Sequence, residues 1–424
     1  MKIFDFILIL SSIISSIWLI LQIIYYKYSF LYNRFINLYN NKKEQKDDIY
    51  YSIIVAIKNE NRDVIKQLID NLKELNWKKY EVIIISDDDE KKFNEIFNGI
   101  SIPYNFKIIR RDNPKDGKAG ALNLGCKEAK GTYLVFLDAD ARIEKDFLIK
   151  LTNKIEKINA LRLEIRNHNE GIIPKIYSSM NEFVMNSLFK GRHVLGLPIF
   201  PNGSALVIEK SVLENIGFWK SQVTEDLELG IRLFYNNYKV NYIDEVKVSV
   251  LAPYTNSDLY RQIERWAYGS GELFLTSLKL IKRGLNGIEA FFYISQWFIN
   301  SLFFFVLLIF AIFQPILNIS YFTYFTSLII YFICIAIYQN ISKVSGNFRI
   351  ALVTTFASLI GYLKGIFKCK YSWKVTPKFK KTEEEFPEIL RVIGYIIIFS
   401  SFMNAIYGQW FTAILLLLIG LSII

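Results

Sequence analysis

Two long runs without a single Asp, Glu, Lys, Arg or His most constrain what this chain can fold into. They cover residues 290–342 and 392–424, and a third apolar run, Ile3 to Tyr26, carries Asp5 as its one charge. An α-helix rises about 1.5 Å per residue, so about 20 apolar residues cross the ~30 Å hydrocarbon core of a bilayer. The sequence therefore predicts a multi-pass protein of the cell membrane, with spans near both ends of the chain.

The Lys and Arg residues between these runs set the expected topology. They follow the N-terminal anchor, residues 1–28, and the positive-inside rule then places the next segment in the cytosol. Residues 350–363 are too few to span and suit a helix in the membrane interface, and the Lys-rich residues 364–391 form a second cytosolic loop. The expected C-terminal membrane region, residues 290–424, has spans over about 290–313, 320–342, 392–406 and 409–424.

The composition limits which partners, metal ligands and acid–base residues this chain can be expected to use. The 51 Lys and Arg residues exceed the 40 acidic ones, but many flank the spans, where they meet anionic membrane lipids. Nucleic acid is not an expected partner, because the aromatic-rich stretches lie in the spans and not among the basic residues. Three dispersed Cys and two His favour neither a disulfide framework nor a zinc site, so carboxylates are the expected acids and bases and oxygen the expected metal ligand.

Residues 50–285 are mixed in composition and alternate between strand-like and helix-like periods. This alternation is typical of a parallel α/β sheet with helices on both faces, in which ligands bind beyond the carboxyl ends of the strands. The expected strands are residues 51–57, 81–85, 105–109 and 133–137, with helices at 63–75 and 118–129.

Acidic side chains follow three of these strands. Glu60 comes after the first, Asp87 and Asp88 after the second, and Asp138 and Asp140 after the fourth. Their mutual repulsion at one edge of the sheet favours a hard cation, Mg²⁺ or Mn²⁺, with a diphosphate as co-ligand. An isolated Asp-x-Asp is as typical of a solvated turn, so this pattern gains weight only with the motifs around it.

Five short motifs occur in order along the chain, and together they resemble the family 2 glycosyltransferases. The membrane branch that contains cellulose, hyaluronan and chitin synthases is the closest match, and Trp373-Lys-Val-Thr-Pro-Lys378 is similar to the cytosolic gating loop of that branch. The resemblance implies a GT-A (Rossmann-like) nucleotide-sugar-binding domain inserted between transmembrane helices. The motifs are Val55-Ala-Ile-Lys-Asn-Glu60, Lys118-Ala-Gly-Ala-Leu-Asn123, Asp138-Ala-Asp140, Thr224-Glu-Asp226 and Gln262-Ile-Glu-Arg-Trp266.

The same resemblance implies an inverting reaction with a UDP-sugar donor of the UDP-glucose or UDP-N-acetylglucosamine type. Asp226 would be the general base, and an ordinary Asp pKa of ~4 would make it a weak one. Asp138 and Asp140 would bind Mg²⁺ or Mn²⁺, with Asp138 also contacting the donor. The remaining substrate-binding residues implied are Glu60, Asp87 or Asp88 at the base, Lys118, Gln262, Arg265 at phosphate, Trp266 at the acceptor sugar, and Thr376 and Lys378 of the gating-type loop.

The sequence departs from the family pattern at two places and leaves the acceptor open. Ala56 stands where the family usually carries Pro, and Ser86-Asp87 stands where it carries two Asp residues. A loop on the acceptor side is expected around Asn202-Gly-Ser204. The predicted activity is extension of a polysaccharide at the cytosolic face of the membrane. The alternative is transfer of one sugar to a membrane lipid, as in ceramide glucosyltransferases.

Overall fold

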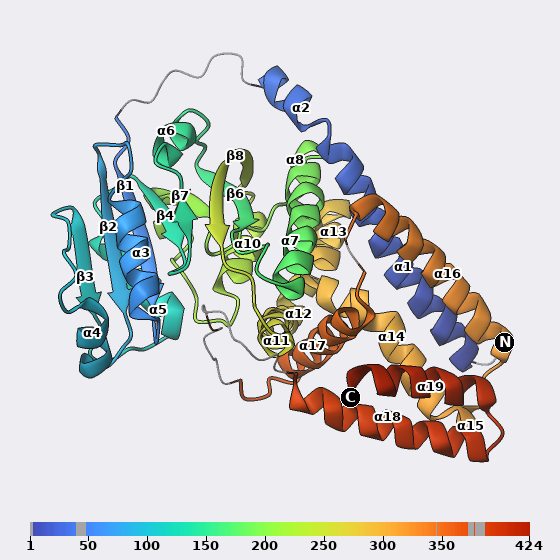
Figure 1. Ribbon diagram of the computed structural model, residues 1–424. Helices are drawn as coiled ribbons and strands as arrows, with labels where there is room; N and C mark the ends of the chain where they lie inside the picture. The colour runs from blue at the N-terminus through green and yellow to red at the C-terminus, as the bar shows by residue number, and fades with distance from the viewer. Residues whose placement is uncertain (1–2, 40–47, 345, 372–376, 378–385) are drawn as a thin grey trace.

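The computed structural model describes residues 3–39, 48–344, 346–371, 377 and 386–424 of the chain. An α/β domain forms one side of the molecule and long apolar helices form the other (Figure 1). The N-terminal helix α1 (Ile3–Ser29) lies beside α16 (Tyr321–Ser342), although they are far apart in the sequence. The last two helices, α18 (Glu388–Ile406) and α19 (Trp410–Ile423), pack against each other as a hairpin.

One eight-stranded sheet forms the centre of the α/β domain, in the order β3-β2-β1-β4-β7-β6-β8-β5. The four strands expected from the sequence are all present, within one residue of their predicted bounds. The strands are β1 (Tyr51–Ile57), β2 (Tyr80–Ser86), β3 (Phe106–Arg110), β4 (Tyr133–Leu137), β5 (Arg142–Ile143), β6 (Ile158–Ile165), β7 (Leu206–Glu209) and β8 (Asn241–Val250).

The prediction of a parallel sheet is right for four neighbouring strands and wrong for the sheet as a whole, although β6 and β8 also pair in parallel. Strands β3, β2, β1 and β4 are parallel, as strand–helix alternation requires. Strand β7 runs antiparallel to both β4 and β6, and β5 runs antiparallel to β8, so the sheet is mixed. The strand–helix alternation that predicted parallel pairing ends at residue 137, so it carries no information on the direction of β7.

The central strands are mostly apolar and are buried along most of their length, because helices cover both faces of the sheet. In β1, Ile54 faces one hydrophobic core, whereas Ile53 and Val55 face the other. The first face is covered by α5 (Gly117–Glu128), α9 (Lys210–Asn215) and α10 (Glu225–Tyr235), and the second by α3 (Arg62–Leu72), α4 (Glu90–Phe97) and α6 (Phe147–Thr152).

Helix α1 joins the first of these cores, so the apolar helix and the α/β domain are packed as one body. Trp18 and Tyr25 of α1 are buried in it. At Gly191 a methyl group would lie 1.8 Å from the carbonyl oxygen of Tyr25, so only glycine allows this approach. Gly191 ends a π-helix, η1 (Met185–Gly191), which continues α7 (Ile172–Val184) and leads into α8 (Arg192–Val194).

Among the described residues, four helices are long and apolar enough to cross a membrane, and a bent pair of helices brings the number of candidate spans to five if the pair counts as one span. These helices indicate a multi-pass membrane protein. The four are α1, α16, α17 (Phe348–Ile366) and α18; the bent pair is α13 (Leu285–Ile294) with α14 (Gln296–Ile312), which meet at 68°. The shorter elements are α2 (Tyr32–Tyr39), α11 (Asn256–Glu272), α12 (Phe274–Leu278), η2 (Lys279–Arg283) and α15 (Gln314–Leu317).

Helix α17 is longer than the helix expected over residues 350–363. It begins at Phe348, after the N-cap residue Asn347, and continues to Ile366. It packs closely against α11, the helix that carries Gln262 to Trp266. Glycines allow this approach: a methyl group at Gly361 would lie 2.3 Å from the carbonyl oxygen of Glu264. Its placement in the membrane interface stays a prediction.

Candidate active site

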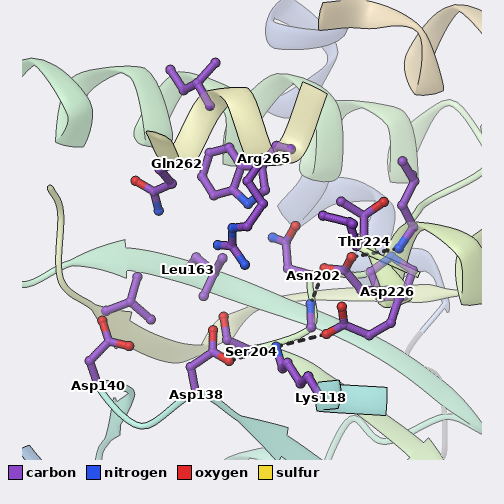
Figure 2. Close-up of a pocket in the computed structure, with 18 of the residues that line it drawn as sticks. Lys118, Asp138, Asp140, Leu163, Asn202, Ser204, Thr224, Asp226, Gln262 and Arg265 are labelled. Carbon is purple, nitrogen blue, oxygen red and sulfur yellow. Dashed lines mark hydrogen bonds and ion pairs between the residues drawn. The ribbon is translucent and has the colours of Figure 1, made fainter. Parts of the chain in front are cut away.

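A cavity of about 1030 Å³ opens at the carboxyl ends of β1, β2 and β4. This is the edge at which the parallel half of the sheet was expected to bind ligands. Figure 2 shows Asp138 and Asp140 on one wall, Gln262 and Arg265 projecting toward them from α11, and Thr224 and Asp226 at one end. The structure therefore brings the separated sequence motifs to one cavity.

The residues after β1 and β2 form the part of the wall nearest the first half of the sheet. Glu60 and Asp87 line the cavity and are buried. Both Asp87 carboxylate oxygens accept from Arg111, whose Nε and Nη2 lie 2.6 Å away. Asp88 turns toward other groups, accepting from the Asn59 backbone N–H (2.5 Å) and from the Ser86 hydroxyl (2.8 Å). Of the two acids, Asp87 is the one at the cavity wall.

The Asp138–Ala139–Asp140 turn follows β4 and presents both acids to the cavity. Asp138 is partly exposed, whereas Asp140 is buried and accepts from the Leu251 backbone N–H at 3.0 Å. Arg142 and Arg166 lie behind the turn. Burial and the neighbouring Arg166 lower the pKa of Arg142 to about 10, against a smaller opposite effect of Asp140.

Lys118 joins the two ends of the cavity. Its Nζ lies 3.0 Å from Asp138 Oδ1 and 3.0 Å from Glu225 Oε1. Burial alone would lower the pKa of Lys118, but the surrounding carboxylates outweigh it and raise the pKa above its ordinary value. Lys118 therefore stays charged and offsets part of the repulsion among the acids.

Asp226 lies at the start of α10, where its carboxylate is held by backbone donors. Oδ2 accepts from the Gly203 N–H at 2.7 Å and Oδ1 from the Leu227 N–H at 2.8 Å. Burial and the adjacent Glu225 raise the pKa of Asp226 to about 6, against the opposing effects of Lys118 and the two N–H groups. The ordinary pKa of ~4 assumed from the sequence is wrong for this site, because it ignores burial.

The expected acceptor-side loop, residues 202–204, lines the same end of the cavity. Its Gly203 backbone holds Asp226, and a methyl group there would lie 3.2 Å from Asp226 Oδ2. The Thr224 hydroxyl is buried, and the part of the chain that the structure describes provides no hydrogen-bond partner for it. Thr224 packs on Gly269 of α11, where a methyl group would lie 2.3 Å from its Oγ1.

Helix α11 supplies the wall opposite the Asp-x-Asp turn through Gln262, Arg265 and Trp266. The Gln262 Oε1 is buried and has no hydrogen-bond partner among the described residues. Trp266 packs against Trp297 with ring centres 5.9 Å apart. Polar donors and an aromatic pair thus face the acidic turn across the cavity.

The Lys118–Asn123 motif has a local structural explanation. Lys118 reaches the acids as described, and Gly120 lies against the preceding loop, where a methyl group would be 2.2 Å from the Lys115 carbonyl oxygen. The Asn123 side chain donates to the Trp219 carbonyl and accepts from the Trp219 N–H, both at 3.0 Å. The motif therefore holds two loops against α5, one before its N-terminus and one beside its middle.

Sequence reasoning missed four residues that the structure places at or beside the cavity. Glu225 entered the sequence analysis only as part of the Thr224-Glu-Asp226 motif, and Arg111 was not among the predicted site residues. Tyr177 and Trp297 lie on helices that no motif marks. Arg111 follows β3, and acidic residues follow the neighbouring parallel strands at the same edge of the sheet. A basic residue directly after a strand is therefore the sequence signal that could have identified it.

Two predicted site residues, Thr376 and Lys378, lie outside the described residues. Pro377 between them is described and lines the cavity. The substrate-binding role of this segment stays a prediction.

Acids outnumber bases on the described cavity wall by eight to three. A diphosphate entering such a wall requires an added cation. No group of three or more His, Cys, Asp or Glu side chains able to hold a metal is found within the described ranges. Two carboxylates on one turn nevertheless fit Mg²⁺ or Mn²⁺, which are commonly held by one or two carboxylates with substrate phosphates completing the shell. The acids are Glu60, Asp87, Asp116, Asp138, Asp140, Glu225, Asp226 and Glu272, and the bases are Lys58, Lys118 and Arg265.

Comparison with known sequences gives a consistent picture. Residues 52–216 match the model of the family described as Glycosyl transferase family 2. A probable glycosyltransferase of Sulfolobus acidocaldarius is 29% identical over 400 residues, covering 86% of each chain. A poly-beta-1,6-N-acetyl-D-glucosamine synthase of Staphylococcus epidermidis is 28% identical over 284 residues, covering 65% of this chain and 67% of that protein.

A solved structure supports the same fold. A mannosyltransferase from Pyrobaculum calidifontis, in complex with GDP-Man and Mn²⁺, matches with a TM-score of 0.52 at 16% identity, covering 84% of this chain and all of that one. At this identity the likeness shows the fold alone, a GT-A-like α/β domain with a mixed sheet.

Proposed function

Because this chain is a family 2 glycosyltransferase with predicted membrane spans, we propose that it transfers a sugar, with inversion, from a UDP-sugar to a growing polysaccharide at the cytosolic membrane face. One observation carries the proposal: the Asp138–Asp140 turn and Asp226 face one cavity, and Lys118 connects Asp138 to Glu225. A group that binds a diphosphate and a group that accepts a proton are thereby held at two ends of one site.

The donor would lie along the wall formed by the carboxyl ends of β1, β2 and β4. Asp87, with Arg111 behind it, is placed for the nucleoside, and Lys118 and Arg265 are the basic side chains for the diphosphate. Asp138 and Asp140 would hold Mg²⁺ or Mn²⁺, which supplies charge neutralisation of the leaving diphosphate when it is bound. The partnerless Gln262 Oε1 is a candidate acceptor for a donor hydroxyl.

In the transfer step the bond from the anomeric carbon to the phosphate oxygen breaks, and its electron pair leaves with the diphosphate. An acceptor hydroxyl oxygen forms the new bond from the opposite face, and its proton passes to Asp226. The raised pKa of Asp226, about 6, makes it a better proton acceptor than an ordinary Asp while leaving it ionised at neutral pH. Lys118 keeps it from rising further.

A saccharide acceptor is supported by aromatic side chains on the cavity wall and by one relative. Trp266 and Trp297 form a pair on this wall, and aromatic faces suit the apolar faces of sugar rings. The Staphylococcus epidermidis relative is named as a synthase of a β-1,6-linked N-acetylglucosamine polymer. UDP-N-acetylglucosamine is therefore the first donor to test, with UDP-glucose next.

A lipid acceptor is the second candidate, favoured by the aliphatic part of the wall. Leu163, Met180 and Val184 line the cavity on the side of α7, and α7 packs near the apolar helices α1 and α16. A hydrocarbon chain would bury against these side chains. The product of the reaction distinguishes the two candidates.

We also propose that residues 1–28 anchor the protein, that residues 50–285 are cytosolic, and that 290–424 form the C-terminal membrane region. The Lys and Arg residues after the first span support this orientation. Tyr104 is fully exposed, so Tyr104→Cys, in a chain with the three native Cys replaced by Ser, reports the side of the membrane. A membrane-impermeant maleimide should label it in opened but not in intact cells, and labelling in intact cells would contradict the orientation.

The decisive experiment incubates the protein in lipid nanodiscs with Mn²⁺ or Mg²⁺ and radiolabelled UDP-sugars, then separates polymer from lipid-extractable product. Label in polymer supports the synthase, and label in one lipid band supports the lipid transferase. Asp226→Asn should abolish either product. Glu228→Gln, on the same helix but paired with Arg232 away from the cavity, is the matched control and should retain activity. No transfer from any donor would contradict the proposal.

A further inference from the structure

Three consecutive backbone carbonyls of the Asp-x-Asp turn accept hydrogen bonds from two guanidinium groups. Arg142 Nη1 donates to the carbonyls of Ala139 (3.1 Å) and Ala141 (2.7 Å). Arg166 Nη2 donates to the carbonyl of Asp140 at 3.0 Å. The arginines thus grip the turn from the side away from the cavity, and the carboxylates of Asp138 and Asp140 line the cavity on the other side.

The same two arginines tie the turn to opposite parts of the domain. Arg142 Nη2 donates to the Val64 carbonyl on α3 at 2.9 Å. Arg166 Nη1 donates to the Ser249 carbonyl on β8 at 3.1 Å. Hydrogen bonds of the two arginines therefore connect the turn both to a helix that covers the parallel half of the sheet and to a strand of the other half. A shift of either half would move the turn unless these bonds break.

The need to give the backbone carbonyls of this turn a hydrogen-bond donor does not by itself explain why the donors are arginines. Two adjoining segments are held by neutral asparagine side chains instead, since Asn71 brackets the backbone of Ile143 and Asn167 brackets that of Ala252. At the Asp-x-Asp turn the chain places two partly buried positive charges close together, which repel one another and must be desolvated. Their electrostatic benefit falls on Asp140, the acid they share.

We propose that Arg142 and Arg166 are positioning residues that set the affinity of the Asp138–Asp140 turn for a divalent cation together with a nucleoside diphosphate. They hold the turn by its carbonyls and place positive charge behind its acids. The turn, and with it both acids, is then held in place before any cation arrives. The inference rests on the proposed function, because it assigns the turn to a cation and a diphosphate.

The test compares Arg142→Lys and Arg166→Lys with the wild type in binding and in turnover. Lysine keeps the charge but loses the planar fork that reaches two carbonyls at once. The matched control is Arg232→Lys: Arg232 also donates to backbone carbonyls, those of Ile216 and Phe218, but holds a turn outside the cavity wall. Binding of UDP with Mn²⁺ is measured by calorimetry, and Mn²⁺ alone by electron paramagnetic resonance.

Each of the two lysine variants should weaken binding of UDP with Mn²⁺ by about 10- to 100-fold, the range typical of partners behind metal ligands. In the two lysine variants, kcat at saturating donor and Mn²⁺ should fall by a smaller factor than the KM for the donor rises. Arg232→Lys should leave both kcat and KM unchanged. Thermal unfolding separates misfolding from mispositioning. If a lysine variant does not fold, Arg166→Gln, which retains an N–H donor, replaces it, with the same expected loss of affinity.

Two results would overturn the inference, and they differ from failure of the proposed function. Wild-type affinity in folded lysine variants would overturn it while leaving the function intact. An equal loss of affinity in Arg232→Lys would reduce the effect to general stability. If the wild type binds neither UDP nor GDP in the presence of Mn²⁺, the proposed function itself fails and the inference falls with it.

Discussion

The two carboxylate centres of the cavity are held in opposite ways. At the Asp-x-Asp turn, arginines grip the backbone carbonyls and the carboxylates project into the cavity. At Asp226, backbone N–H groups grip the carboxylate itself, and burial raises its pKa to about 6. The first arrangement suits acids that bind a cation, and the second suits an acid that takes up a proton. Environment, not residue type, separates the two proposed roles.

The largest expected effect is loss of transfer in Asp226→Asn. The amide keeps an oxygen for one of the two backbone donors but cannot accept the acceptor proton, so kcat should fall by about 10²–10⁴-fold. Binding of UDP with Mn²⁺ should be unchanged, because the turn is untouched. Turnover and calorimetry on the same preparation measure both. A matching loss of UDP affinity would break the division of roles between the two centres.

Asp140→Asn should show the reverse pattern. Its amide oxygen can still accept from the Leu251 N–H, but one charge is lost from the turn. Loss of a hydrogen-bond partner of a metal ligand typically weakens metal binding by about 10- to 100-fold. We expect the apparent Mn²⁺ affinity to fall by at least this factor. Mn²⁺ titration of the activity measures this, with Asp146→Asn on the outer helix α6 as control. Full activity at low Mn²⁺ would contradict the assignment.

The pH dependence follows from the raised pKa of Asp226. The proposed base works only when ionised, so kcat/KM should rise with pH through a midpoint near 6 and fall below it. Lys118→Gln removes a positive charge that favours the carboxylate, so the midpoint should move to higher pH, whereas Lys118→Arg should largely restore it. An unchanged midpoint in Lys118→Gln would mean that the acid limb belongs to another group.

The smallest expected effect is an opposite shift in Glu225→Gln. Glu225 raises the pKa of Asp226 through like-charge repulsion, so its removal should move the acid limb to lower pH, by less than about one unit. It also removes one partner of Lys118, and donor affinity reports that change separately. A shift to higher pH would show that the Lys118–Glu225 contact, not repulsion, controls Asp226.

Much of the first half of the fold is predictable from the sequence. Short runs of β-branched residues and helical periods predicted β1 to β4, α3 and α5, because each of these elements has a hydrophobic pattern of its own within a short segment of sequence. The second half is not predictable in this way. Strand β7 is only four residues long and antiparallel, and its partners lie on distant segments. The stretch 257–280 has amphipathic spacing, and the structure divides it among α11, α12 and η2.

The candidate site divides in the same manner. The acids after the strands and the Gln262–Trp266 motif are visible as residue patterns, and the cavity gathers them. Arg142 and Arg166 carry no such mark, because only the fold brings Arg142 to the Val64 carbonyl and Arg166 to the Asp140 carbonyl. Likewise, Asp87 and Asp88 are adjacent in sequence, but only the fold turns Asp88 toward the Asn59 backbone and Asp87 toward the cavity.

The sequence by itself determined where apolar helices and buried strands form, and which acids follow the strands, because hydrophobic period and residue chemistry are local properties. Only the tertiary structure decided that the sheet is mixed, that α1 packs into the core of the α/β domain, and that Asp226 lies half-buried beside Glu225 and Lys118. Strand direction, burial and pKa depend on groups brought together from distant parts of the chain, and no local pattern encodes those distances.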